Sequence, residues 1–242
     1  MVTTYILNIK RLERDKIFQS YFEDMPLQRR KKIERAKSRM DKNRSLGAGI
    51  ILARGLFAYG IDSRTAFIRE GRYGKPYLVK DVGVDGAEEP LDVYFNLSHS
   101  GDYVVGAFGG TPVGIDIEHQ RENIEKLARR CFNTKEQEQF FACGSREERE
   151  ELFLRYWTRK ESASKALGLG LQLDFCNISC ETDGCVLVNT GDKCENYFLR
   201  EIEILPKTDI MENGKDKYRI AVCAKTPDFA PKPVWVELDE TV

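Results

Sequence analysis

The stretch FNLSHSGDYVVGAFGGTPVGIDIE, residues 95–118, decides the fold of this chain. Its last residues, Gly114-Ile115-Asp116-Ile117-Glu118, alternate in the manner of a β-strand. Residues two apart in a strand share a face, so we expect the carboxylates of Asp116 and Glu118 to point the same way. Gly109-Gly110-Thr111, just before them, predicts a tight hairpin into this strand.

A second stretch, YWTRKESASKALGLG at residues 156–170, is typical of a helix, and it places Glu161 and Lys165 four apart on one side. If this helix packs over the end of the strand, three carboxylates converge beside a lysine. Such a cluster repels itself unless a cation fills it, and oxygen ligands favour a hard ion such as Mg²⁺. The two stretches together outline a site for phosphate chemistry.

Length and composition narrow the classes of function. The chain has 242 residues, of which 41% are hydrophobic and 32% charged, and its net charge is -1. This balance is typical of a globular protein with no general attraction for nucleic acid. No apolar run is long enough to span a bilayer, and the first residues lack a signal-peptide pattern. We therefore expect a cytoplasmic protein that binds neither nucleic acid nor membrane.

The cysteines are odd in number and irregularly spaced. Without an export signal, this pattern predicts reduced thiols in a cytoplasm. The four cysteines between Cys176 and Cys194 contain no CxxC pair, which argues against a zinc site.

The first half of the chain predicts one strand, one long helix and then further strands. Residues 3–9 form the opening strand. Pro26 suits the first turn of a helix that runs to Phe57 and ends near Gly60, and the first part of this helix is strongly basic. We expect the rest of this half to hold a strand at 66–69, a turn at 72–76, an acidic loop at 81–92, and strands at 94–97 and 103–108.

The second half predicts helices followed by β structure. Thr134-Lys135-Glu136-Gln137 and Ser145-Arg146-Glu147-Glu148 both match the capping-box pattern, so each is expected to begin a helix. The later helix runs to about Leu167 and ends at Gly168. The residues beyond it alternate like strands, with a turn at Asn213-Gly214.

Each half thus offers helix and antiparallel strands. This order favours an α+β fold of two similar lobes over one doubly wound sheet. We expect the join near Gly109 to Gly114, with an N-terminal lobe of residues 1–110 and a C-terminal lobe of residues 111–242.

Several short motifs, in this order and spacing, resemble the 4'-phosphopantetheinyl transferases of the Sfp (surfactin) type. Singly each motif is common, but the ordered set is specific, and it covers the chain from the basic helix to about residue 170. The motifs are Gly74-Lys75-Pro76, Asn96-Leu97-Ser98-His99-Ser100, Gly114-Ile115-Asp116-Ile117-Glu118, and Trp157-Thr158-Arg159-Lys160-Glu161-Ser162 with Lys165.

The resemblance implies two α+β lobes related by a pseudo-two-fold axis, with coenzyme A and Mg²⁺ in the cleft between them. Such an enzyme moves the 4'-phosphopantetheine group of coenzyme A onto a serine of an apo acyl or peptidyl carrier protein. The by-product is adenosine 3',5'-bisphosphate. Because this chain would hold both lobes itself, we expect a monomer.

Within this resemblance Asp116, Glu118 and Glu161 are the expected Mg²⁺ ligands. Lys165 is expected to contact phosphate and to act in catalysis. The base that takes the serine proton is either Glu161 or a metal-bound water relayed by Glu136, and the sequence leaves both open.

Coenzyme A is expected to contact a further set of residues. Ser98 and His99 offer hydroxyl and imidazole groups to phosphate, and Lys160 is a further candidate. Gln28 stands where the family tends to have a lysine, so that Arg29 or Lys32 is expected to compensate. The residues that correspond by position to the family's adenylate end are Lys31, Arg44 and Lys75.

Other functions remain open at this point. A metal-dependent nuclease also uses clustered acids, and a non-catalytic coenzyme A sensor or carrier-protein binder would share the fold. A short, trimeric fatty-acid enzyme is disfavoured by the two lobes. The carrier could serve fatty-acid, polyketide or non-ribosomal peptide synthesis. We expect it to contact residues 121–132, where Arg129 and Arg130 would meet an acidic helix.

Overall fold

The computed structural model of the chain describes residues 1–80, 88–119, 121–169, 173–180, 182–191, 193–204 and 217–239. Most of the expected acidic loop and the expected Asn213-Gly214 turn lie outside these residues.

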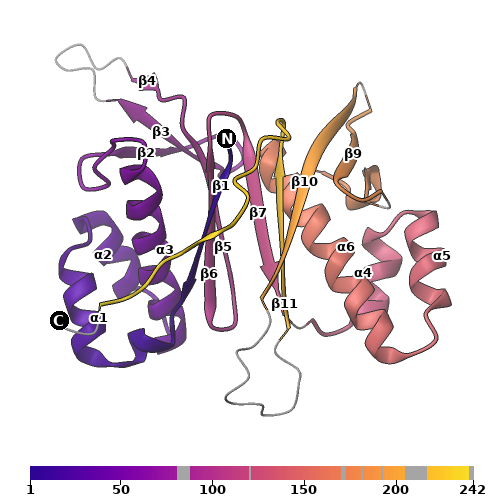
Figure 1. Ribbon diagram of the computed structural model, residues 1–242, viewed down its shortest axis with the longest axis horizontal. Coiled ribbons are helices and arrows are strands. Elements are labelled where there is room, and N and C mark those ends of the chain that lie inside the picture. Colours follow the sequence, from indigo (N-terminus) through magenta and orange to yellow (C-terminus); the bar gives the residue numbers. More distant parts are fainter. Residues whose placement is uncertain are drawn as a thin grey trace.

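Two β-sheets lie face to face in the middle of the molecule, and helices cover the outer face of each (Figure 1). Alternate apolar residues of their strands, such as Ile6, Val105, Ile115 and Val222, form the buried layer between the sheets. The remaining alternate residues pack against the helices. The layers therefore run helix, sheet, sheet, helix, which confirms the predicted α+β class.

The first sheet has the strand order β12-β1-β6-β5, and the second has the order β7-β11-β10-β9-β8. The first consists of β1 (Thr3–Asn8), β5 (Tyr94–Ser100), β6 (Tyr103–Gly109) and β12 (Val234–Trp235). The second consists of β7 (Val113–Glu118), β8 (Ile178–Ser179), β9 (Cys185–Asn189), β10 (Cys194–Ile204) and β11 (Tyr218–Ala224). A small third sheet holds β2 (Phe67–Glu70), β3 (Pro76–Lys80) and β4 (Glu89–Pro90).

The chain changes sheets between β6 and β7, and the expected hairpin at Gly109-Gly110-Thr111 is therefore wrong. Strand β6 pairs with β1 and β5, whereas β7 pairs with β11. Pro112 has no N–H to donate to a ladder. Along β7, Val113, Ile115 and Ile117 turn toward the first sheet instead of pairing with it.

The helical layer of the first half contains one break that the sequence prediction missed. The expected long helix is two helices, α2 (Leu27–Glu34) and α3 (Arg39–Phe57), preceded by a 3-10 turn (Lys10–Glu13) and α1 (Asp15–Glu23). Ser38 caps α3, since its side chain accepts a hydrogen bond from the Asp41 N–H. This cap begins a new helix where the sequence pattern alone suggested continuation.

The second half has α4 (Ile124–Cys131), α5 (Thr134–Ala142) and α6 (Arg146–Leu167). The capping box of Ser145 and Glu148 is confirmed. That of α5 uses Asn133 and Glu136, one residue earlier than predicted. Gly168 ends α6 in the left-handed region, at φ 73°, as expected. No helix in the described part of the chain combines the length and hydropathy needed to cross a bilayer.

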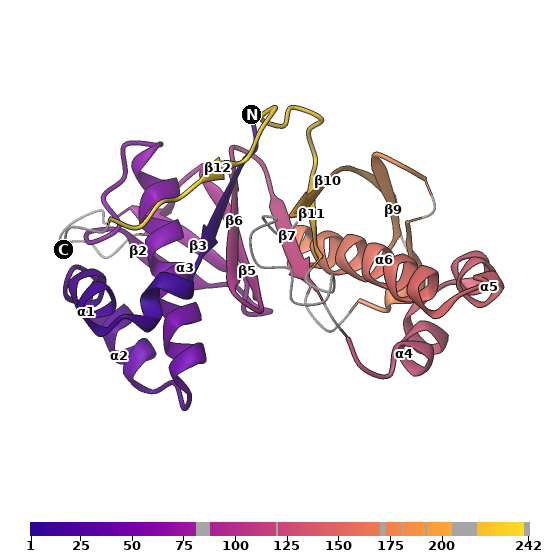
Figure 2. The same cartoon turned by 60° about the horizontal axis from the view of Figure 1, so that its bottom comes forward.

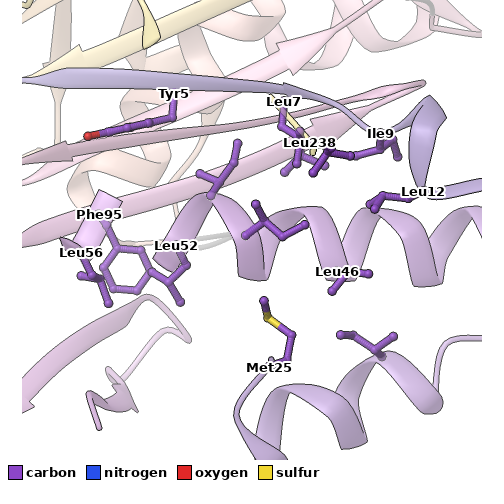
Figure 3. Packing of buried hydrophobic residues seen from close by; sticks show 14 of the residues in the cluster. Tyr5, Leu7, Ile9, Leu12, Met25, Leu46, Leu52, Leu56, Phe95 and Leu238 are labelled. Carbon is purple, nitrogen blue, oxygen red and sulfur yellow. The ribbon is translucent and has the colours of Figure 1, made fainter. Parts of the chain in front are cut away.

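The C-terminal tail returns to the first sheet, as Figure 2 shows for β12 beside β1. Val236 N–H donates to the Ile6 carbonyl. Leu238 is buried among residues of the first core, close to Leu7 and Ile9 (Figure 3). The expected C-terminal lobe of residues 111–242 therefore does not hold for its last segment, because the open edge of β1 offers hydrogen-bond partners to the tail.

Candidate active site

Strand β7 carries its acids on the face that α6 covers. The apolar residues of β7 lie in the layer between the sheets, so Gly114, Asp116 and Glu118 face the other way. A Cβ on Gly114 would overlap the carbonyl oxygen of Ser162 and the amide of Ala166. Helix α6 therefore lies directly on β7, which brings Glu161 and Lys165 to the acids of the strand.

Lys165 is bound to Asp116. Its Nζ donates to Asp116 Oδ1 at 2.6 Å, to Ser98 Oγ at 3.1 Å and to the Ile115 carbonyl at 3.2 Å. Ser98 Oγ in turn donates to Asp116 Oδ1 at 2.9 Å. Ser98 belongs to β5, the edge of the first sheet, and Asp116 to β7, the edge of the second. The cluster is thus assembled from both halves of the molecule.

The three acids destabilise one another's charges. Burial and then the Asp116 charge raise the pKa of Glu118 to about 7. The pKa of Glu161 is also raised, first by burial and second by Asp116. Asp116 Oδ2 is buried and has no hydrogen-bond partner. A bound cation would stabilise the charged forms of Glu118 and Glu161 and would give Asp116 Oδ2 a partner.

The carboxylate oxygens of Asp116, Glu118 and Glu161 are ligands that a hard divalent ion prefers, but they are not arranged around one point. Among the described residues, no three His, Cys, Asp or Glu side chains stand close enough to hold a metal as they are. The partner of Asp116 is the ammonium of Lys165. The unpartnered Oδ2 of Asp116 and the raised pKa values of Glu118 and Glu161 fit a site for Mg²⁺.

A cavity of about 570 Å³ opens beside this cluster in the first half. Its wall carries Arg29 and Lys32 from α2, Arg44 from α3 and His99 from β5, with Ser98 nearby. Desolvation and then the Arg44 charge lower the pKa of His99, and burial lowers that of Arg29. Arg44 Nε is held by the Gly101 carbonyl at 3.1 Å. Three cations, Arg29, Lys32 and Arg44, outnumber the two carboxylates of the wall, Asp41 and Glu70, so the wall favours an anion.

Lys31 is not among the described residues that line this cavity, although it was an expected cofactor contact. Its side chain is exposed. Arg29 and Lys32 do line the cavity, on the same face of the helix as Gln28. The geometry thus favours the two residues that were expected to compensate for Gln28.

A smaller cavity of about 280 Å³ also adjoins the turn between β2 and β3. Its lining includes Glu161, Lys165, Lys75, Tyr73 and Phe175. Both cavities share Gly74, Pro76 and Asn96 in their walls. A ligand that spans both cavities would pass between Ser98, in the wall of the larger one, and Lys165, in the wall of the smaller one.

Lys75 lines the smaller cavity and not the larger one, where a contact with the adenylate end of the cofactor was expected. Its Nζ donates to the Ala166 carbonyl at 2.8 Å and to the Val113 carbonyl at 3.2 Å. Both acceptors belong to the second half of the chain, so this lysine links the two halves.

Lys160 and Glu136 are not on the ligand surface either. Both side chains are 0% exposed and form an ion pair with 2.7 Å between Nζ and Oε2. Lys160 also donates to the Phe175 carbonyl at 2.8 Å, and Glu136 accepts from the N–H groups of Asn133 and Cys180. The structure therefore speaks against Lys160 as a phosphate contact and against Glu136 as a relay, because neither reaches solvent.

Asn96 and His119 have positions that the sequence analysis did not foresee. Asn96 Oδ1 accepts the Ile115 N–H at 2.9 Å, which satisfies the free edge of β7 from the first sheet. In the sequence, the polar Asn96 between the apolar Phe95 and Leu97 was the feature that could have indicated this role. His119 lies 3.0 Å from Ser100 Oγ and stacks on Tyr218, at 4.7 Å between ring centroids.

The chain is similar to known proteins over most of its length. The model of the 4'-phosphopantetheinyl transferase superfamily matches residues 112–223. A 4'-phosphopantetheinyl transferase of Bacillus subtilis is 31% identical over 84% of this chain and 83% of its own. The 4'-phosphopantetheinyl transferase Sfp of Bacillus subtilis (strain 168) is 30% identical over 88% of each.

Among solved structures, the crystal structure of Thermotoga maritima holo-[acyl-carrier-protein] synthase is one of the matches. It matches with a TM-score of 0.31 at 20% identity, over 48% of this chain and 64% of that one. A score this low carries no argument about the site.

Proposed function

The chain belongs to the 4'-phosphopantetheinyl transferases of the Sfp type, an enzyme family that modifies carrier proteins, and on that premise we propose its reaction. It transfers the 4'-phosphopantetheine group of coenzyme A to a serine of an apo acyl or peptidyl carrier protein and releases adenosine 3',5'-bisphosphate. The observation that carries this proposal is the contact of Lys165 with Asp116 and Ser98, where both halves meet beside a cationic cavity.

Coenzyme A has two separated groups of negative charge, and the proposal places each at a matching wall. Its adenosine 3'-phosphate lies in the larger cavity, where Arg29, Lys32 and Arg44 supply positive charge and His99 supplies an N–H donor. Its diphosphate lies at Lys165 and Ser98. The pantetheine arm then continues into the smaller cavity, past Tyr73.

Asp116, Glu118 and Glu161 are the residues that would hold Mg²⁺. The ion would supply positive charge to the diphosphate oxygens, and it would relieve the repulsion that raises the pKa values of Glu118 and Glu161. The buried, unpartnered Oδ2 of Asp116 supports this assignment.

In the proposed step the carrier serine Oγ attacks the β-phosphorus, and the bond from that phosphorus to the bridging oxygen breaks. The electron pair leaves with the adenosine bisphosphate. Lys165 offsets the charge that builds on the phosphoryl oxygens, which is usually the largest catalytic contribution. Glu161 takes the serine proton, because its carboxylate lines the smaller cavity together with Lys165, and Glu136 is too deeply buried to serve as a relay.

The carrier protein is proposed to approach α4. Arg129 and Arg130 are exposed on this helix and are basic groups that an acidic carrier helix would meet. The seven cysteines are free thiols, which fits a reducing cytoplasm. Because one chain supplies both walls of the site, we propose that the enzyme acts as a monomer.

The test is a transfer assay with purified protein, coenzyme A, Mg²⁺ and an apo carrier, read by mass spectrometry of the carrier. We expect a mass gain of one phosphopantetheine. Asp116→Ala and Glu161→Ala should each lower turnover by at least about 100-fold, the loss typical of one key electrostatic group. The exposed Glu147→Ala is the matched control.

Three results would contradict the proposal. Coenzyme A binding without transfer would indicate a sensor. Near-full activity of either acid variant would exclude the metal assignment. Tight, salt-sensitive DNA binding without coenzyme A binding would favour a nuclease.

A further inference from the structure

The turn between β2 and β3 is a compact element that forms part of both cavities. Gly71 N–H donates to the Lys75 carbonyl, and Gly74 N–H donates to the Gly71 carbonyl. Gly74 has φ +79°, a conformation that favours glycine. Gly74 and Pro76 line the larger and the smaller cavity alike. A shift of this turn would therefore change both walls at once.

Lys75, within this turn, contacts residues of the second half of the chain. Its methylene stem lies on Gly168, where a Cβ would come within 2.9 Å of Lys75 Cδ. Gly168 is also the residue that ends α6, with φ +73°. A side chain at Gly168 would thus collide with Lys75 as well as strain the backbone. The absence of a side chain at Gly168 leaves the space that the stem of Lys75 occupies.

The two acceptors of Lys75 are main-chain carbonyls in need of a donor. Ala166 lies in the last turn of α6, where carbonyls have no partner within the helix. A positive charge at this end also interacts favourably with the helix dipole. Val113 begins β7, the edge strand of the second sheet. Lys75 therefore caps a helix and holds a strand from another part of the chain.

Both anchored elements carry the site. Ala166 follows Lys165 directly, and β7 continues from Val113 to Asp116. We infer that Lys75 is a positioning residue, which ties the turn at the cofactor cavity to the ends of α6 and β7 and so holds Lys165 and Asp116 in register. This inference rests on the proposed function, and it assigns the Lys75 ammonium to the two carbonyls, while the side chain also lines the smaller cavity.

The surroundings of Lys75 agree with this role. Two of its three N–H bonds are taken by the carbonyls. No described carboxylate forms an ion pair with it, and burial lowers its pKa to about 8. Because its ammonium is held by two main-chain carbonyls, Lys75 fixes the positions of these carbonyls.

The kinetic test compares Lys75→Met, which keeps the stem and removes the donors, with Lys75→Arg, which restores donors. Lys80→Met, an exposed lysine of the same hairpin, is the matched control. We expect Lys75→Met to lower kcat about 10- to 100-fold, because misplacement by about 1 Å has effects of this size. The Kd for coenzyme A, measured calorimetrically without carrier, should change less than about threefold.

Lys75→Arg should recover at least about a third of the lost kcat, and Lys80→Met should behave as the wild type. A Kd for coenzyme A raised tenfold or more with kcat retained would overturn the inference in favour of a direct cofactor contact. An unchanged kcat for Lys75→Met would overturn it as well.

Hydrogen–deuterium exchange tests the same contact without reference to catalysis. The amides at the end of α6, including that of Gly168, which bonds to the Ser164 carbonyl, should exchange several-fold faster in ligand-free Lys75→Met than in the wild type or Lys80→Met. Unchanged exchange would overturn the inference. A wild-type protein that transfers nothing would instead refute the proposed function, and the exchange result would still decide whether Lys75 anchors α6.

Discussion

Gly114 of β7 lies directly against Ser162 of α6, so closely that a Cβ on the glycine would overlap the serine carbonyl oxygen. This contact sets the distance between the strand that carries Asp116 and the helix that carries Lys165. The bond of 2.6 Å between their side chains depends on it. The geometry of the site therefore depends on the absence of a side chain at Gly114, which allows α6 to pack closely on β7.

Gly114→Ala should destabilise the protein and reduce transfer. The added methyl group must push α6 off β7, and overpacking of this kind typically lowers the free energy of unfolding by about 1–3 kcal/mol. Urea unfolding and the transfer assay measure the two effects. Gly110→Ala, at a glycine with open space around it, should change the free energy of unfolding by less than about 0.5 kcal/mol. Equal stability of the two variants would contradict this account.

The ion pair of Lys160 and Glu136 should matter for stability more than for chemistry. Removing one partner, as in Lys160→Met, leaves a buried charge alone and should cost about 3–5 kcal/mol of unfolding free energy. The double variant Lys160→Met with Glu136→Leu should lose less than either single change. Chemical denaturation measures both. A stable Glu136→Gln with turnover abolished would return Glu136 to the catalytic residues.

Arg29 should decide how strongly the enzyme prefers coenzyme A to its 3'-dephospho form. Arg29→Gln removes a cation from the wall of the larger cavity and should raise the KM for coenzyme A about tenfold. The KM for dephospho-coenzyme A should stay nearly constant. Lys31→Gln is the control and should change both values less than about twofold. A larger effect at Lys31 would refute the assignment.

The lowered pKa of Lys75 predicts a pH dependence of stability. The folded protein releases this proton near pH 8 and the unfolded chain near 10.5, so between these values the unfolded state binds more protons. The free energy of unfolding should therefore gain up to roughly 3 kcal/mol from this group as the pH rises through that window. Lys75→Met should lack this gain, measured as the difference between two denaturation series. Parallel pH profiles would exclude the shift.

Charge reversal at Arg129 and Arg130 should weaken the encounter with an acidic carrier. We expect the KM for the carrier to rise several-fold and to become less sensitive to salt, since charges at the edge of an interface act mainly on association. The affinity for coenzyme A should not change. An unaltered KM for the carrier would place its docking site elsewhere.

Local periodicity explains which features could be predicted from the residues. The period of two along β7 puts Asp116 and Glu118 on one face, and the period of α6 puts Glu161 and Lys165 on one side. The stop of α6 at Gly168 follows from a backbone conformation that glycine adopts readily. The reaction was predicted from the family motifs, since each residue of the acid cluster belongs to one of them.

Long-range packing explains what could not be predicted. Lys160 and Glu161 are neighbours in sequence, yet the turn of the helix sends one into a buried ion pair and the other to a cavity wall. Lys75 meets Ala166 across 91 positions of sequence. The change of sheet after β6 depends equally on distant surfaces.

The sequence by itself therefore determined the faces of the strand and helix that carry the acids, the α+β class and the chemistry, because these follow from spacing along one element. The tertiary structure decided which lysines reach a ligand, which are buried, and where the tail pairs. Those outcomes depend on which elements exclude water from a side chain, and no local pattern records that.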